Sequence, residues 1–196
     1  MRIIAGKYRR RLLQTSPGEV TRPITDRVKE SLFENISQRL IGKRVADIFA
    51  GTGTIGLEAL SRGAERVTLI EKDKVALQLM RENIASLGCE AETLIWPADI
   101  LRCSFRPKGK KAPGFAPFDA IFFDPPYKMV PSLKAGSPLW LALVRLARED
   151  VSAPGATLIL RVPERTPFEL PEQWKSQWTL KMSHMEIHLC ERSITT

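Results

Sequence analysis

Apolar and polar positions along the chain follow two repeating patterns. Short apolar runs bounded by glycine, proline or charged residues predict strands that are buried on both faces of a parallel sheet. Longer stretches with apolar residues three or four positions apart predict amphipathic helices. The expected strands are residues 44–49, 67–71, 91–96, 120–123 and 156–162, and the expected helices are 26–40, 55–62, 74–87 and 139–148. This alternation predicts one main α/β domain built on a parallel, doubly wound sheet.

The carboxyl-terminal residues follow a different pattern. Apolar and polar side chains alternate from Trp174 to Met182 and again from Met185 to Leu189, which is typical of an antiparallel hairpin. His184 and His188 stand four positions apart, a spacing that binds metal on a helix but puts both side chains on the polar face of a strand. We therefore expect a carboxyl-terminal hairpin and no metal site.

The composition is that of an ordinary globular protein. Hydrophobic residues make up 43% and charged residues 27% of the 196 positions. No apolar run approaches the roughly 18 residues of a membrane span, and the amino terminus lacks the apolar segment of a signal peptide. The three cysteines, Cys89, Cys103 and Cys190, are scattered, which favours reduced thiols over disulfides or zinc. We expect a cytoplasmic protein, monomeric and without a membrane partner.

Positive charge is concentrated at the amino terminus. Residues 1–44 hold 11 Lys and Arg against 4 Asp and Glu, whereas the remaining 152 residues have a net charge of only +1. Two short β-like pieces around Gly6 predict a hairpin, in which Tyr8 would stack on an unpaired base and cations would meet phosphate groups. The candidate cations are Lys7, Arg9, Arg10, Arg11, Arg22 and Arg27. The alternative is a solvated basic face without a partner.

A glycine-rich turn follows the first expected strand. Gly51-x-Gly53-x-x-Gly56 allows a tight turn and a close approach of the backbone to a ligand, so a cofactor is expected over this loop. Acidic residues end the first three strands of the main domain, and parallel strands present their carboxyl ends at one sheet edge. These acids are Asp47, Glu71 and Asp99.

The same glycine pattern also satisfies the dinucleotide fingerprint, with Glu71 placed 20 residues after Gly51 to hold a ribose diol. A nicotinamide-dependent oxidoreductase is therefore one hypothesis. Two features favour S-adenosylmethionine instead, because nicotinamide binding requires neither. They are the acid Asp47 at the end of the first strand and the Asp-Pro-Pro-Tyr sequence that ends the fourth.

The fourth strand ends in Asp124-Pro125-Pro126-Tyr127. Two prolines in succession remove two backbone donors, which leaves nearby carbonyl groups without their usual ladder partners. The Asp124 carboxylate and the Pro125 carbonyl are suited to accept hydrogen bonds from an exocyclic amine, and the Tyr127 ring is suited to stack on a planar base. The alternative is a proline-rich turn with a capping aspartate and a surface tyrosine.

Taken in order, these motifs resemble those of class I, Rossmann-like methyltransferases that modify exocyclic amino groups. Three further stretches point to one family within this class: residues 2–6, 22–33 and 49–64. With them the chain resembles the bacterial RsmD family, which methylates guanine N2 in small-subunit ribosomal RNA. The resemblance covers nearly the whole chain. It departs at the basic loop 102–117, which is longer than the link usual in the family and which is either mobile or in contact with substrate phosphate.

The resemblance implies a seven-stranded methyltransferase sheet, S-adenosylmethionine as donor, S-adenosylhomocysteine as product and 16S rRNA in the small ribosomal subunit as partner. Residues 1–43 would be a basic extension that contacts RNA, and residues 44–196 the methyltransferase domain. Glu71 would hold the ribose, Asp99 the adenine amine, and Asp124 with Pro125, Pro126 and Tyr127 the target guanine. The methionine moiety would lie against Asp47, Ala50, Gly51, Thr52, Gly53 and Gly56.

Two further hypotheses remain open from the sequence. One is the same chemistry on adenine N6 in DNA or RNA, because Asp-Pro-Pro-Tyr also resembles the motif of those enzymes. The other is an RNA-binding assembly factor that has the fold without the activity.

Overall fold

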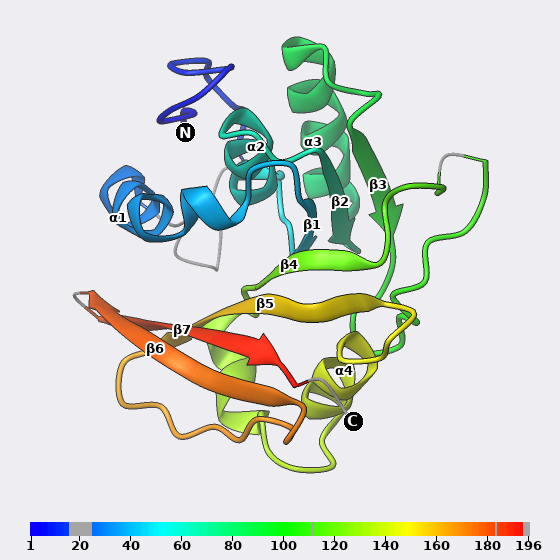
Figure 1. The fold of residues 1–196 in the computed structure, drawn as a ribbon. Helices are drawn as coiled ribbons and strands as arrows, with labels where there is room; N and C mark the ends of the chain where they lie inside the picture. The colour runs from blue at the N-terminus through cyan, green and yellow to red at the C-terminus, as the bar shows by residue number, and fades with distance from the viewer. Residues whose placement is uncertain (16–24, 111, 183, 194–196) are drawn as a thin grey trace.

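The computed structural model describes residues 1–15, 25–110, 112–182 and 184–193, and within them a single seven-stranded sheet forms the centre of the molecule (Figure 1). Its spatial order is β3-β2-β1-β4-β5-β7-β6. The strands are β1 (Arg44–Ile48), β2 (Arg66–Glu71), β3 (Thr93–Pro97), β4 (Phe118–Phe123), β5 (Ser152–Pro163), β6 (Trp174–Met182) and β7 (Met185–Arg192). The first five are parallel, and β7 runs antiparallel to both β5 and β6. The predicted mostly parallel sheet with a carboxyl-terminal hairpin is confirmed.

Helices cover both faces of the sheet, with α1, α2 and α3 on one side and α4 and η2 on the other (Figure 1). They are α1 (Asp26–Ile36), α2 (Thr54–Ser61), α3 (Lys74–Leu87), α4 (Pro138–Leu146) and the 3₁₀ turns η1 (Ser37–Arg39) and η2 (Tyr127–Ser132). Side-chain caps begin three of the helices, because Thr25, Asp73 and Ser137 each accept a hydrogen bond from a backbone N–H three residues on. The helix predicted over residues 26–40 is an α-helix only as far as Ile36, and the chain continues as the 3₁₀ turn η1.

Alternation along the strands divides the core into two clusters. Ala120 and Phe122 of β4 pack with α1–α3, whereas Ile121 and Phe123 pack with α4. Because side chains at every second position share a face, Asp124 lies on the same face as Ala120 and Phe122. The position of Asp124 relative to the last residues of β4 thus decides that its side chain points to the face covered by α1–α3.

The amino-terminal segment, residues 1–13, packs against α2 and α3. The predicted hairpin is reduced to a single antiparallel bridge between Arg2 and Leu12, flanked by the hydrogen bond from Ile3 N to Arg11 O at 3.0 Å. Gly6 makes this packing possible: with φ of +84°, an added Cβ would lie 1.7 Å from the Ser61 carbonyl oxygen. Ile3 is fully buried in the cluster on the α1–α3 face.

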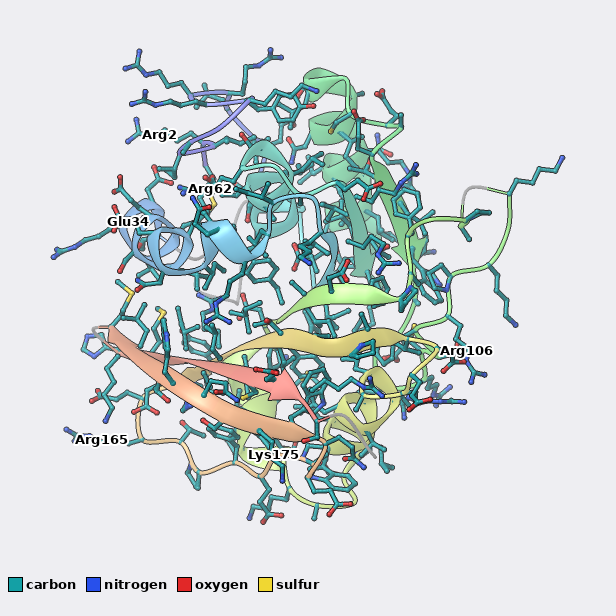
Figure 2. The ribbon with its side chains drawn as sticks, viewed as in Figure 1. Arg2, Glu34, Arg62, Arg106, Arg165 and Lys175 are labelled. Carbon is teal, nitrogen blue, oxygen red and sulfur yellow. The ribbon has the colours of Figure 1, made fainter. Side chains whose placement is uncertain are left out.

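A buried charge network fastens this segment to the helices. The Glu58 carboxylate on α2 is fully buried and accepts hydrogen bonds from Ile4 N at 2.8 Å and Ala5 N at 3.1 Å. It also pairs with Arg62 Nε at 2.7 Å and with Nζ of the fully buried Lys29 at 3.2 Å. Burial lowers the pKa of Lys29, and the Glu58 carboxylate opposes that shift. Arg2 and Arg62 lie on the same side of the molecule, beside α1 (Figure 2).

Candidate active site

The carboxyl ends of four parallel strands bring the predicted acidic residues to one edge of the sheet. Asp47 is the second-to-last residue of β1, and Glu71 ends β2. Asp99 follows β3, and Asp124 follows β4 directly. The order β3-β2-β1-β4 places the chain reversal between β1 and β4, which is where open α/β sheets bind ligands. The structure thus brings the four acids together at the sheet edge where the sequence places the site, and their roles stay a prediction.

The glycine-rich loop after β1 is held from both sides. Gly51 and Gly53 have φ of +54° and +83°, and Phe49 before them has φ of +65°, a conformation that a bulky residue adopts only when its surroundings impose it. Gly51 N donates to Glu71 Oε2 at 2.9 Å, and Asn83 on α3 donates to the Thr52 carbonyl at 3.0 Å. The loop backbone is thus fixed before any ligand arrives.

Asp47 is the most perturbed acid of the site. Its side chain is buried, its Oδ2 accepts from Gly56 N at 2.8 Å, and its Oδ1 has no hydrogen-bond partner among the described residues. Burial raises the pKa of Asp47 to about 8, against the lowering effect of the Gly56 N–H. A buried acceptor without a donor fits a ligand that brings one, and the ammonium group of a methionine moiety supplies both a donor and the missing positive charge.

Glu71 and Asp99 have different surroundings. Glu71 Oε1 accepts from the backbone N–H groups of Lys72 and Asp73, at 2.7 and 2.8 Å, so the carboxylate is rigidly oriented at the end of β2. Asp99 Oδ1 accepts from Leu101 N at 3.1 Å, while Oδ2 lies 3.6 Å from Lys72 Nζ. Both carboxylates keep oxygen lone pairs that a hydroxyl or an amine is able to reach.

The Asp-Pro-Pro-Tyr turn continues β4 into η2. Asp124 N donates to Ile48 O at 3.4 Å, which extends the ladder between β1 and β4 to the aspartate itself. Pro125 is buried, and the Pro126 carbonyl accepts from Met129 N at 2.7 Å to start η2. The Tyr127 hydroxyl lies 3.9 Å from the Met185 sulfur at the start of β7. The turn is therefore part of the folded scaffold, set between the cofactor loop and the carboxyl-terminal hairpin.

Arg161 of β5 is the site residue that the sequence reasoning missed. Its Nε donates to Asp124 Oδ1 at 2.7 Å and its Nη2 to Oδ2 at 2.6 Å, while Cζ lies 5.5 Å from the centre of the Tyr127 ring. Burial by itself would lower the pKa of Arg161, but the Asp124 carboxylate outweighs it and the pKa is raised. The signal was present, because a single arginine inside the apolar run of a central strand calls for a buried partner.

The predicted nucleic-acid cations are mostly at the surface. Lys7, Arg9, Arg10 and Arg11 of the amino-terminal segment, and Arg27 of α1, are exposed, whereas Arg22 lies outside the described residues. The prediction that Tyr8 stacks on a base is wrong. Tyr8 is only 7% exposed and packs in the core beside α2, because docking of the segment turns its ring inward.

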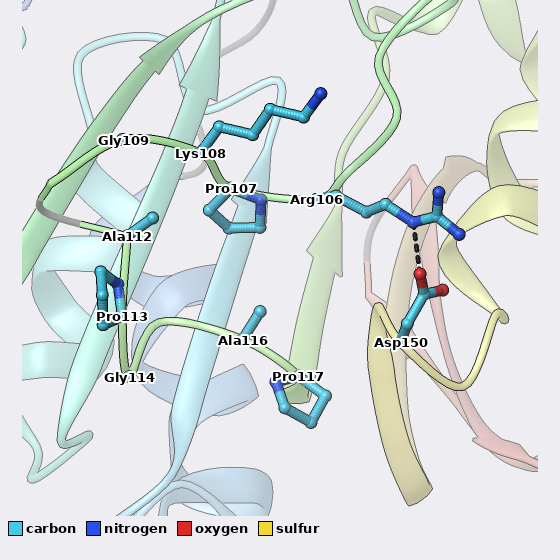
Figure 3. A pocket seen from close by; sticks show the side chains of 10 residues that line it. All are labelled: Arg106, Pro107, Lys108, Gly109, Ala112, Pro113, Gly114, Ala116, Pro117 and Asp150. Carbon is cyan, nitrogen blue, oxygen red and sulfur yellow. Dashed lines mark ion pairs between the residues drawn. The ribbon is translucent and has the colours of Figure 1, made fainter.

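The basic loop after β3 leads away from this edge. Cys103 and Phe105 are buried against α4, and Arg145 Nε donates to the Cys103 carbonyl at 2.9 Å. Farther along, a cavity of about 410 Å³ is lined by residues 106–109, 112–114, 116 and 117 and by Asp150 (Figure 3). Arg106 and Asp150 form an ion pair across it. It lies at the amino end of β4, so it is separate from the site around Asp124.

The remaining features of the described residues concern metal binding, the cysteines and membrane-spanning helices. Within the described part of the chain, no group of three or more His, Cys, Asp or Glu side chains is arranged to hold a metal ion. His188 instead contacts Thr179 at 2.9 Å and Glu186 at 3.2 Å. The three cysteines are buried and free. No helix among the described residues has the length and apolar character needed to cross a membrane.

A seven-stranded sheet of this order, with a fixed glycine loop after β1 and acids at the ends of β1 and β2, defines the class I, Rossmann-like methyltransferases. Solved structures agree: the putative methyltransferase yhhF from Escherichia coli superposes with a TM-score of 0.79 and 27% identity, covering 98% of each chain. An RNA methyltransferase from Salinibacter ruber, solved with S-adenosyl-L-homocysteine, shares the fold with a TM-score of 0.63, over 89% of this chain and 96% of that one, at 14% identity.

The family follows from the sequence comparisons. The family model described as conserved hypothetical protein 95 matches residues 1–187. Ribosomal RNA small subunit methyltransferase D of Haemophilus influenzae is 33% identical over 174 residues, which is 89% of this chain and 84% of that protein. The chain belongs to this family of methyltransferases, the RsmD family, as its motifs indicate.

Proposed function

We propose that the chain transfers a methyl group from S-adenosylmethionine to the exocyclic N2 of a guanine in 16S rRNA of the small ribosomal subunit. The observation that carries the proposal is the position of the Asp-Pro-Pro-Tyr turn, one strand away from the glycine loop at the same sheet edge. The name of the Haemophilus influenzae relative supports a ribosomal RNA substrate. Membership of a methyltransferase family favours S-adenosylmethionine over the nicotinamide cofactor that the glycine motif alone allowed.

S-adenosylmethionine supplies the methyl group and leaves as S-adenosylhomocysteine. Residues of this chain would hold it in three parts. Asp47 and the backbone of residues 50–56 face the methionine moiety, Glu71 the ribose hydroxyls and Asp99 the adenine amine. The buried and unpartnered Oδ1 of Asp47 supports this assignment, because it needs a donor that the described residues do not provide.

The chain's contribution to the reaction of the target guanine is to position the base and to accept hydrogen bonds from its amino group. The amino nitrogen of guanine is a poor nucleophile because its lone pair is delocalised into the ring. Asp124 and the Pro125 carbonyl would accept the two N–H groups, favour a more pyramidal nitrogen and aim its lone pair toward the methyl donor, while Tyr127 supports the ring. Catalysis then rests on orientation and on acceptors that are already in place.

Methyl transfer with labelled S-adenosylmethionine tests the proposal. Unmodified small subunits, free 16S RNA and DNA are offered as acceptors, then digested and the labelled nucleoside identified. We expect N2-methylguanosine from the RNA substrates. Label in adenine would contradict the guanine assignment while keeping the fold and mechanism, and no label in any acceptor would favour a non-catalytic RNA-binding role.

Asp124→Ala measures the role of the carboxylate. We expect a loss of at least 100-fold in methyl transfer, because an oriented acceptor contributes about 3–4 kcal/mol to a transition state. Cofactor affinity, measured by calorimetry with S-adenosylhomocysteine, is expected to change little. Asp150→Ala, the same substitution just before the amino end of β5, is the matched control. Equal loss of cofactor binding in Asp124→Ala would show that the role is misassigned.

A further inference from the structure

Arg161 contacts Asp124 and Tyr127, the two side chains that the proposed reaction assigns to binding the target base. Both oxygens of Asp124 accept N–H groups from its guanidinium, and the same planar cation lies against the Tyr127 ring. The pair is largely shielded from water, since the two side chains are only 10% and 12% exposed. Neither the glycine loop nor the proposed role of Asp124 explains why Arg161 of β5 is hydrogen-bonded to both oxygens of the Asp124 carboxylate.

The register of the sheet makes the contact a fixed feature of the fold. Phe123 of β4 lies opposite Leu160 of β5, so the next residues, Asp124 and Arg161, are neighbours on the same face. β5 is hydrogen-bonded to β4 on one side and to β7 on the other, which holds its backbone in place. Release of Asp124 therefore has to come from rotation of the Arg161 side chain and not from movement of the strand.

A guanidinium and the edge of guanine present the same donors. A guanidinium is planar and offers two parallel N–H groups to a carboxylate. Guanine contains the same arrangement of nitrogens around C2, with N1–H and an N2–H side by side. Adenine and cytosine instead have a ring nitrogen next to the amine that only accepts hydrogen bonds. A carboxylate that binds Arg161 through two bonds therefore matches guanine and mismatches the other two bases.

We propose that Arg161 is an internal placeholder for the target guanine and a specificity-determining residue of the acceptor pocket. This proposal rests on the proposed function. In the substrate-free protein the Arg161 guanidinium occupies both oxygens of Asp124, and the base must displace it. Only a base with two adjacent donors replaces both hydrogen bonds, so adenine is rejected. Arg161 Nη1, buried and without a partner among the described residues, leaves the closed arrangement incompletely satisfied and assists its release.

The test is Arg161→Ala, assayed by steady-state methyl transfer with and without low-millimolar guanidinium chloride. Without the placeholder Asp124 stays free, so the KM for the RNA is expected to fall by the fraction of native molecules in which Asp124 is free, about tenfold for a free fraction of about a tenth. Added guanidinium refills the pocket and is expected to inhibit the variant competitively while leaving the native protein unchanged. The proposal is overturned if kcat/KM falls and guanidinium restores it, because Arg161 would then be needed to position Asp124.

A control variant, a substitute variant and an NMR measurement complete the test. Arg145→Ala removes another partly buried arginine, on the opposite face, and is expected to show neither the KM change nor sensitivity to guanidinium. If Arg161→Ala does not fold, Arg161→Lys, which lacks the planar pair of donors, is expected to lower the KM to a smaller extent. In the native protein, the Nε–H NMR signal of Arg161 should shift when unmodified RNA binds, and an unshifted signal would overturn the proposal.

The identity of the product separates this inference from the proposed function. N2-methylguanosine together with an unchanged or raised KM in Arg161→Ala would refute the placeholder alone. A labelled nucleoside other than N2-methylguanosine would refute the guanine assignment and the placeholder with it.

Discussion

Replacement of Glu58 by glutamine tests how strongly the buried charge network holds the amino-terminal segment. All of the groups that contact the carboxylate are donors: two backbone N–H groups, Arg62 and Lys29. A glutamine keeps one acceptor oxygen but turns an NH₂ group toward donors and leaves Lys29 charged and unpaired. Breaking a buried ion pair by removing one partner costs about 3–5 kcal/mol.

We therefore expect Glu58→Gln to lower the free energy of unfolding by about 4 kcal/mol. In a protein of 196 residues this corresponds to a fall in melting temperature on the order of 10 °C. Urea unfolding followed by circular dichroism measures the change directly. Glu65→Gln is the matched control, because Glu65 is exposed and lies 3.9 Å from Arg66 in a surface pair worth less than about 1 kcal/mol.

A double-mutant cycle with Lys29→Met separates the pair from its surroundings. If Lys29 and Glu58 stabilise each other, the two substitutions together should cost less than the sum of the two alone. A loss of under about 1 kcal/mol in Glu58→Gln, equal to that of the surface control, would refute the reasoning from buried charge.

The remaining predictions concern the glycine contact, the cofactor site and the basic surface. Gly6→Ala should destabilise the protein more than Gly42→Ala, since both have positive φ but only Gly6 meets backbone, and equal melting temperatures would contradict this. Affinity for S-adenosylhomocysteine should rise as pH increases toward 8, as Asp47 ionises, by up to about tenfold for each pH unit; a flat profile, or one that Asp47→Asn leaves unchanged, would argue against it. Glutamines at residues 9–11 should reduce the slope of log affinity for RNA against log salt by about 2. Glutamines at the exposed Lys134, Arg165 and Lys175 are the matched control, and an equal reduction of the slope from them would contradict the prediction.

The sequence was sufficient to locate the candidate site because its signals are local. Glu71 and Asp124 each come at the end of a short apolar run whose length and bounding residues predict a buried strand, and parallel strands place such residues at one sheet edge. The glycine loop carries its own requirement for positive φ at Gly51 and Gly53. These inferences need no knowledge of which strand lies beside which.

The features that were missed depend on strand order and docking. Arg161 lies 37 residues from Asp124, and only the pairing of β4 with β5 makes them neighbours. Tyr8 looks like an exposed aromatic residue within a basic hairpin, but the segment packs on α2 and turns the ring into the core. The division into residues 1–43 and 44–196 stays a prediction. Such outcomes follow from long-range contacts that no local pattern encodes.

The docking of residues 1–13 also sets an order of events during folding. This segment is synthesised before α2 and α3, yet these helices carry several of its hydrogen-bond partners: Glu58, Ser61 and Ser86. Its contacts with α2 and α3 form only after both helices have been synthesised and folded, because contacts at such sequence separation form only after the intervening loop closes. This strongly basic segment is therefore made before α2 and α3 and reaches its native position against them only after they have folded.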